Sequence, residues 1–170
     1  MAPLVRPGHA EGQAADTVVL EFSGFRAGAP VGEVAALIRL RGGQFRCQRA
    51  KVDPRVSECR GTLDDLSVGG PVEIWLSAID SISGVITISG QLESTQFARW
   101  KTSIERRYGP AGARVEGSQW MMQWVHRQRM LRLTWRVERG KRSASVSLID
   151  GRVLDSWGRD RSRARQPGQS

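Results

Sequence analysis

Cysteine, histidine and tyrosine are scarce in this 170-residue chain, which contains two cysteines, two histidines and one tyrosine. Two thiols are too few for a four-ligand zinc site, and His9 and His126 lie far from them in the sequence. Catalysis by a nucleophile and a base generally needs histidine beside serine or cysteine, or two facing carboxylates. The carboxylate pair Asp64-Asp65 is typical of a solvated turn next to glycines. We therefore expect a protein that is not an enzyme and that binds no metal or other cofactor.

Long apolar runs are also missing. No stretch approaches the roughly 18 apolar residues of a transmembrane helix, and residues 1–20 lack the basic segment and apolar run of a secretory signal. Hydrophobic residues at 39% and charged residues at 25% are nevertheless normal for a globular protein. We expect a flexible lead-in over 1–16, a single domain over 17–158 and a disordered basic tail over 159–170. The domain is expected to be monomeric and to have no membrane span.

The net charge of +9 is unevenly distributed. Residues 1–96 carry 9 basic and 11 acidic side chains, residues 97–151 carry 12 and 4, and residues 152–170 carry 5 and 2. The basic character therefore belongs to the second half of the chain. It permits an anionic partner such as a nucleic acid, but it does not require one.

Hydrophobic periodicity predicts a helix followed by antiparallel strands, and the same order then recurs. The first helix follows Gly28-Ala29-Pro30 and ends at Gly42-Gly43, and the second places Phe97 and Trp100 on one face. Alternation of apolar and polar residues predicts strands with one covered and one open face. These strands are Gln44–Ala50, Val56–Leu63, Val72–Ile79, Ile82–Leu92, Gln119–Val125, Met130–Val137 and Ala144–Ile149. The predicted fold is α+β, with two tandem helix-plus-strands repeats (24–92 and 94–150) whose helices pack on one face of a single curved antiparallel sheet.

The two cysteines flank a turn. Cys47 and Cys59 each lie six residues from Asp53, which with Pro54 favours the turn of a hairpin. This spacing places the cysteines opposite each other in an antiparallel pair, close enough for a disulfide. A disulfide would indicate an oxidising compartment. The alternative is two small buried thiols.

Residues Gly28-Ala29-Pro30-Val31-Gly32-Glu33-Val34 resemble the Gly-x-x-x-x-Glu-Val helix start of the small outer-membrane-assembly lipoprotein domain (the BamE/SmpA type). The order of elements and the cysteine spacing are similar to tandem versions of that domain and to the β-lactamase inhibitor protein family. The resemblance covers about 25–155, although Ser94-Thr95-Gln96-Phe97 lacks the glycine and the Glu-Val pair. It implies a non-catalytic, periplasmic or otherwise extracytoplasmic binding domain of bacteria that uses its open sheet face. A cytoplasmic location is the alternative.

The open face supplies the candidate site. Trp75 falls between Glu73 and Ser77 on a polar face, which makes it a candidate hot spot for a protein partner. The alternative is that the N-terminal segment or the tail covers it. The candidate contact residues are Trp75, Gln123, Arg132 and Arg136.

Two alternative roles remain for the arginines of the open face. The arginines on the open face could form a solvated polar surface that limits edge pairing, or part of a basic nucleic-acid-binding domain. A stacking platform for bases is not predicted beside them, because Trp135 faces the opposite side of its strand. The tryptophans predicted to be in the core are Trp100, Trp120, Trp124 and Trp135.

Overall fold

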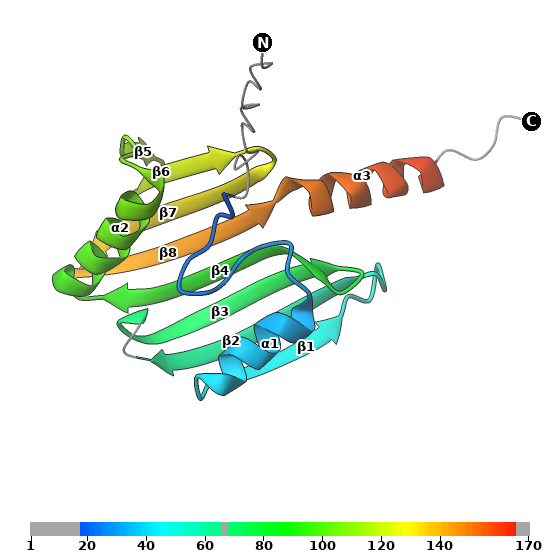
Figure 1. Cartoon of the computed structure of the whole chain (residues 1–170), viewed down its shortest axis with the longest axis horizontal. Coiled ribbons are helices and arrows are strands. Elements are labelled where there is room, and N and C mark those ends of the chain that lie inside the picture. Colours follow the sequence, from blue (N-terminus) through cyan, green and yellow to red (C-terminus); the bar gives the residue numbers. More distant parts are fainter. Residues whose placement is uncertain (1–17, 66–67, 166–170) are drawn as a thin grey trace, which may run out of the picture.

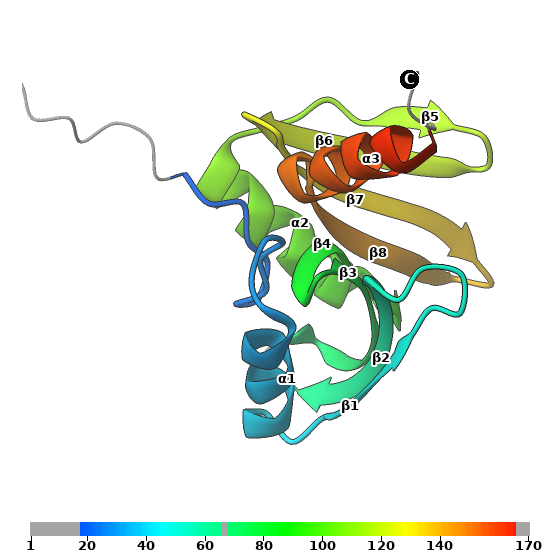
Figure 2. The same cartoon turned by 90° about the vertical axis from the view of Figure 1, so that its right-hand side faces the viewer.

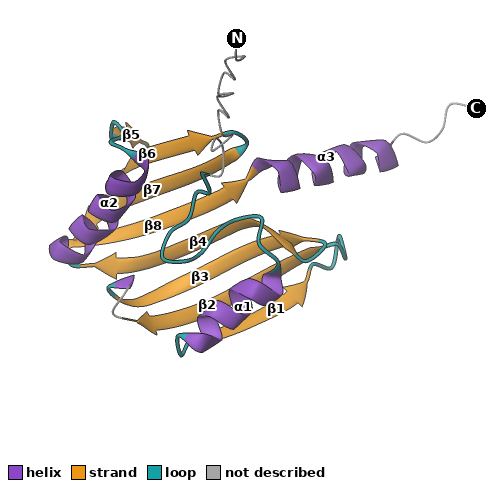
Figure 3. Cartoon of the chain, viewed as in Figure 1, coloured by secondary structure: helices purple, strands orange, loops and turns teal. Residues whose placement is uncertain are grey.

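The computed structural model of the protein describes residues 18–65 and 68–165. Eight strands of this part of the chain form one antiparallel sheet in the order β1-β2-β3-β4-β8-β7-β6-β5 (Figure 1). The strands are β1 Gln44–Arg49, β2 Val56–Asp65, β3 Gly70–Ile79, β4 Ile82–Leu92, β5 Arg114–Glu116, β6 Gln119–His126, β7 Arg129–Glu138 and β8 Lys141–Asp150. The described helices are α1 Val31–Leu40, α2 Ser94–Tyr108 and α3 Gly151–Arg165 (Figure 3).

One face of the sheet carries the core. Helices α1 and α2 and the segment 18–30 lie on this face, as the two perpendicular views show (Figures 1 and 2). Alternation along each strand sends apolar side chains to the helices and polar ones to the other face. In β3, for example, Leu76 is fully buried whereas Glu73 is exposed. The opposite face, which we call the open face, is free of α1 and α2.

The segment before α1 is fixed to this core by polar contacts. The Tyr108 hydroxyl of α2 shares its single proton between the carbonyl oxygens of Val19 and Glu21, which lie at 3.1 and 3.0 Å. The buried Ser83 hydroxyl donates to the Ala29 carbonyl at 2.7 Å. Phe22 packs edge-on against Trp100 with ring centroids 5.0 Å apart. Residues 18–30 therefore belong to the helix layer and lie on the face opposite the open face.

The prediction of two tandem helix-plus-strands repeats is wrong, although the broader α+β class describes the structure. All strands belong to one continuous sheet, and β4 pairs with β8 over eight register partners in its middle. The two helices do not occupy equivalent places, because the ten-residue α1 lies against the edge strand β1 whereas the fifteen-residue α2 lies against β8 and β4. Strand β5 has three residues, and α3 follows β8 as a third helix that the two predicted repeats do not include.

The predicted disordered tail is also wrong over 159–165, which forms the second half of α3. The helix begins after Asp150, whose Oδ1 accepts a hydrogen bond from the Arg152 backbone N–H at 3.0 Å. The Trp157 indole donates to Asp53 Oδ2 at 2.9 Å, and Asp160 pairs with Arg55 at 3.1 Å. Polar contacts to the first hairpin thus fix a helix that has no buried residue. The predicted lead-in 1–16 and the last five residues of the tail lie outside the described residues.

None of the described helices is long and apolar enough to cross a membrane.

Candidate functional site

The hairpin of β1 and β2 carries the predicted disulfide. Cys47 and Cys59 are register partners, are bonded to each other, and have Cα atoms 4.0 Å apart. The Asp53 carboxylate accepts a hydrogen bond from the backbone N–H of Arg55 at 3.0 Å, which closes the turn. Cys59 is fully buried and Cys47 is exposed on the edge strand. The disulfide therefore fixes the register of the edge strand against the core.

The same register aligns seven side chains in one line across the open face. Each is the direct cross-strand partner of the next, from β1 to β6. In order, this central row consists of Arg46, Arg60, Trp75, Thr87, Ser147, Arg132 and Gln123. Three of the four predicted contact residues, Trp75, Arg132 and Gln123, therefore belong to one row, although they come from strands that are distant in the sequence.

At one end of the central row, two arginines lie beside the tryptophan. Arg46 and Arg60 are directly opposite each other. This arrangement is destabilising because the two side chains carry like charges. Among the described residues, no ion pair includes either guanidinium, and Glu73 lies diagonally across from Arg60. Trp75 is half-buried and lines a hollow of about 330 Å³ together with both arginines. Its exposed surface faces this hollow, so it is available to a partner.

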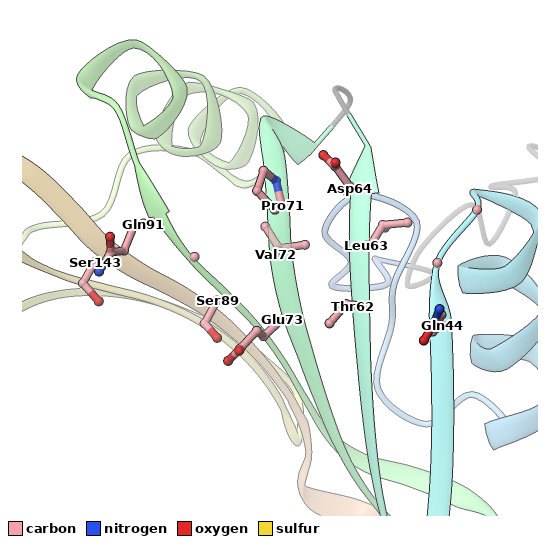
Figure 4. Close-up of a pocket in the computed structure, with 13 residues that line it drawn as sticks. Gln44, Thr62, Leu63, Asp64, Pro71, Val72, Glu73, Ser89, Gln91 and Ser143 are labelled. Carbon is pink, nitrogen blue, oxygen red and sulfur yellow. The ribbon is translucent and has the colours of Figure 1, made fainter.

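Hydroxyl groups form the floor in the middle of the open face. Thr87 and Ser147 are hydrogen-bonded across β4 and β8 at 3.0 Å, and Thr134 and Ser145 across β7 and β8 at 2.8 Å. A larger hollow of about 640 Å³ lies beside the central row, and Figure 4 shows its side chains on successive strands. On the open face it is lined by Gln44, Thr62, Glu73, Ser89, Gln91 and Ser143. The sheet is thus hollowed on the face that the helices leave open.

Arg132 lies at the other end of the row and is incompletely paired. Its Nη2 donates to Gln123 Oε1 at 3.2 Å and lies 3.6 Å from the Met130 sulfur. Its Nε is buried and has no hydrogen-bond partner among the described residues. A buried donor without a partner costs free energy and is rare in native proteins. Arg132 is therefore the polar group of the open face that most needs an explanation.

Arg136 does not join the row. It lies four residues farther along β7, about 13 Å away along the strand, and its Nε pairs with Glu138 at 2.9 Å. Both side chains are about half exposed. Trp75 and Arg132 are also separate, because two strands lie between theirs, which places them about 14 Å apart across the sheet.

A second row of side chains, which we call the apolar row, runs beside the central row on the open face. Val85, Ile149, Met130 and Val125 are successive register partners from β4 to β6. The first three are half-buried, and Val125 is 63% exposed. The open face therefore offers a polar row and an apolar row side by side over its second half.

The structure corrects the prediction for Trp120 and adds two arginines to the site. Trp120, predicted to be core, is 45% exposed and stacks on Trp135 with ring centroids 6.3 Å apart. Arg46 and Arg60 did not enter the predicted site. The spacing that pairs Cys47 with Cys59 also places Arg46 opposite Arg60, so the signal was present in the sequence.

In the described part of the chain, no group of three or more His, Cys, Asp or Glu side chains is arranged to hold a metal ion. Comparison of the chain with protein-family models, curated proteins and solved structures finds no match. The geometry of the open face is therefore the basis for the functional proposals that follow.

Proposed function

We propose that the protein is a non-enzymatic binding module of the bacterial envelope or periplasm, and that its open face contacts a protein partner. The half-buried Trp75 in a hollow of that face carries the proposal. Tryptophan and arginine dominate the binding energy of protein interfaces, and here Arg60 is the cross-strand neighbour of Trp75. Helices α1 and α2 lie on the opposite face of the sheet, so they do not stand between a partner and the central row.

The disulfide supports the location. Disulfides persist in oxidising compartments and are rare in the cytosol, and the Cys47–Cys59 bond is formed. Such a bond in a chain of this size suits a protein that works outside the cytoplasm. The resemblance of residues 28–34 to envelope proteins agrees with this location.

A nucleic-acid partner is the second candidate, favoured by one specific observation. The C-terminal half of α3 is a helix that projects from the end of β8 and carries Arg159, Arg161, Arg163 and Arg165 (Figure 1). Binding of this kind should weaken steeply as salt increases, because counterions are released. If a fluorescent twelve-residue oligo-dT or a short duplex does not bind at low salt, this candidate is excluded.

Site-specific photocrosslinking tests the main proposal. A benzoylphenylalanine residue replaces Ser147 in the middle of the open face, and a control protein carries it at the exposed Ala36 on α1. Each protein is incubated with an envelope extract of the source organism. We expect a crosslinked protein from position 147 but not from position 36, and we expect Trp75→Ala to reduce its yield.

The captured protein would then be purified and its affinity for the wild-type chain and for Trp75→Ala measured directly. Equal crosslinking from both positions, or a yield that Trp75→Ala leaves unchanged, would contradict the proposal.

A further inference from the structure

We infer that the partner presents a carboxylate to Arg132, so that the open face selects an acidic protein segment. This inference rests on the proposed function, because it names the chemistry of a partner at the same face. Its starting point is the guanidinium itself, whose Nε is buried without a partner among the described residues. The hydrogen bond to Gln123 and the contact with the Met130 sulfur use Nη2 alone.

The surroundings of Arg132 provide no internal counter-charge. On the open face of the described strands β4, β8, β7 and β6, Glu138 is the only carboxylate, and it already pairs with Arg136. The neighbours of Arg132 across the strands are Ser147 and Gln123, which are neutral. A half-buried arginine in such a setting attracts an external carboxylate more strongly than an arginine in water would, because the local dielectric is lower.

The guanidinium also has the geometry for a carboxylate. Its N–H groups form a rigid fork that matches two carboxylate oxygens, and such charge-assisted pairs are among the strong hydrogen bonds of proteins. Because Nε is covered in the free protein, we expect the side chain to turn outward from the sheet when the partner binds. Nε and Nη2 would then pair side by side with the two oxygens. The buried donor would gain the partner that it lacks.

The adjacent apolar row indicates which kind of residue should flank the acidic residue in the partner segment. Met130 is two residues from Arg132 on the same strand, and its cross-strand partners are Ile149 and Val125. An apolar side chain that follows or precedes the acidic residue would lie against this row. The expected partner segment therefore combines glutamate or aspartate with an aliphatic or aromatic neighbour.

A nucleic acid fits this part of the face less well. Binding to a phosphate backbone uses a track of several cations, whereas the cross-strand neighbours of Arg132 are the neutral Ser147 and Gln123 and the next arginine of its strand face is about 13 Å away. At the other end of the row, Glu58 lies two residues from Arg60 on β2 and Glu73 lies diagonally across from Arg60 on β3. Both carboxylates would repel successive phosphates. The distribution of charge favours a single carboxylate over a chain of phosphates.

The test uses the side-chain Nε–Hε signal of Arg132 in ¹H–¹⁵N spectra of the full chain, with the capped peptide Ac-Ala-Leu-Glu-Phe-Ala-NH₂ as the probe. The control peptide has glutamine in place of glutamate. We expect a saturable shift of the Arg132 signal with the acidic peptide and at least tenfold weaker binding of the control. Arg132→Gln should abolish binding and Arg132→Lys should weaken it. The control Arg99→Gln, which changes an exposed arginine of α2 on the other face of the sheet, should leave binding within about twofold.

Equal binding of the two peptides, no shift at Arg132, or tighter binding of twelve-residue oligo-dT would each overturn the inference. The two proposals fail separately. If the captured partner binds Arg132→Gln as tightly as wild type, the carboxylate inference is wrong while the open-face function stands. If the photocrosslinker at position 147 captures no partner, the proposed function is wrong whatever the peptides do.

Discussion

The backbone of Gly28 passes so close to Asp150 that a Cβ atom at residue 28 would lie 2.6 Å from the carboxylate Oδ2. Gly28 also has a φ of +88°, in the region where side chains are strained. This contact joins the segment before α1 to the junction of β8 and α3. The glycine is thus required by both its backbone conformation and its neighbour.

We expect Gly28→Ala to lower the free energy of unfolding by about 2–4 kcal/mol, because it adds backbone strain and displaces a buried, ion-paired carboxylate. The matched control is Gly32→Ala in α1, where a Cβ atom would meet nothing within 4 Å. There alanine should stabilise the helix by about 0.5–1 kcal/mol. Urea denaturation measures both values, and equal effects of the two substitutions would refute the explanation.

Asp150 itself should make stability depend on pH. Burial raises the pKa of its carboxyl, but the hydrogen bonds from Arg152 and Arg129 outweigh burial, and the pKa is lowered from its ordinary value of 3.8. A lowered pKa stabilises the fold above the unfolded value of about 3.9, and this stabilisation is lost as pH falls through the folded value. Wild type should therefore lose stability as the pH falls below about 4.

Asp150→Asn tests this dependence. At pH 7 it should cost about 2 kcal/mol, the range of charge-assisted hydrogen bonds, and the difference from wild type should shrink between pH 5 and pH 3. The control Asp155→Asn changes an exposed carboxylate on α3 and should have almost no effect. A difference between wild type and Asp150→Asn that stays constant over this range would show that the charge is not responsible.

The parts of the fold that local pattern determines could be predicted. Alternation located β3 and β4, and the position of Asp53 between Cys47 and Cys59 determined the hairpin register. The same register places Arg46 opposite Arg60 in the central row, although neither arginine belongs to a motif of known chemistry. Local pattern could also place Arg132 on the open face. It could not show that Arg132 and Trp75 share a row, because this depends on the pairing of β4 with β8.

The errors arose where distant contacts decide the structure. Residues 159–165 have no apolar periodicity, and their helix depends on contacts such as Asp160 with Arg55, which is 105 residues away. The two-repeat architecture failed for a related reason. A helix-then-strands order says nothing about which strands each helix covers, and here α1 lies at the edge of the sheet while α2 lies near its middle.

Reduction of the disulfide should destabilise the protein without unfolding the second half of the sheet. A bond between residues 12 apart removes about 2–3 kcal/mol of unfolded-state entropy, and Cys47 is exposed to reductant. Urea denaturation with and without dithiothreitol measures the loss, and the double variant Cys47→Ser, Cys59→Ser should be insensitive to dithiothreitol. Two reactive thiols in the untreated native protein would contradict the disulfide and remove its support for an extracytoplasmic location.

Trp75 and Trp100 should respond in opposite ways to truncation. Trp100 is 4% exposed, donates from its indole to the Val68 carbonyl at 2.8 Å and packs on Phe22, so Trp100→Ala should cost about 3–5 kcal/mol. Trp75 is half-buried on the open face. Trp75→Ala should therefore lower the free energy of unfolding by no more than about 1 kcal/mol, while it weakens binding to the partner. Denaturation curves of both variants, together with crosslinking yields from position 147, separate stability from binding. A loss of several kcal/mol in Trp75→Ala would mean that this tryptophan is a core residue and would remove the observation on which the proposed function depends.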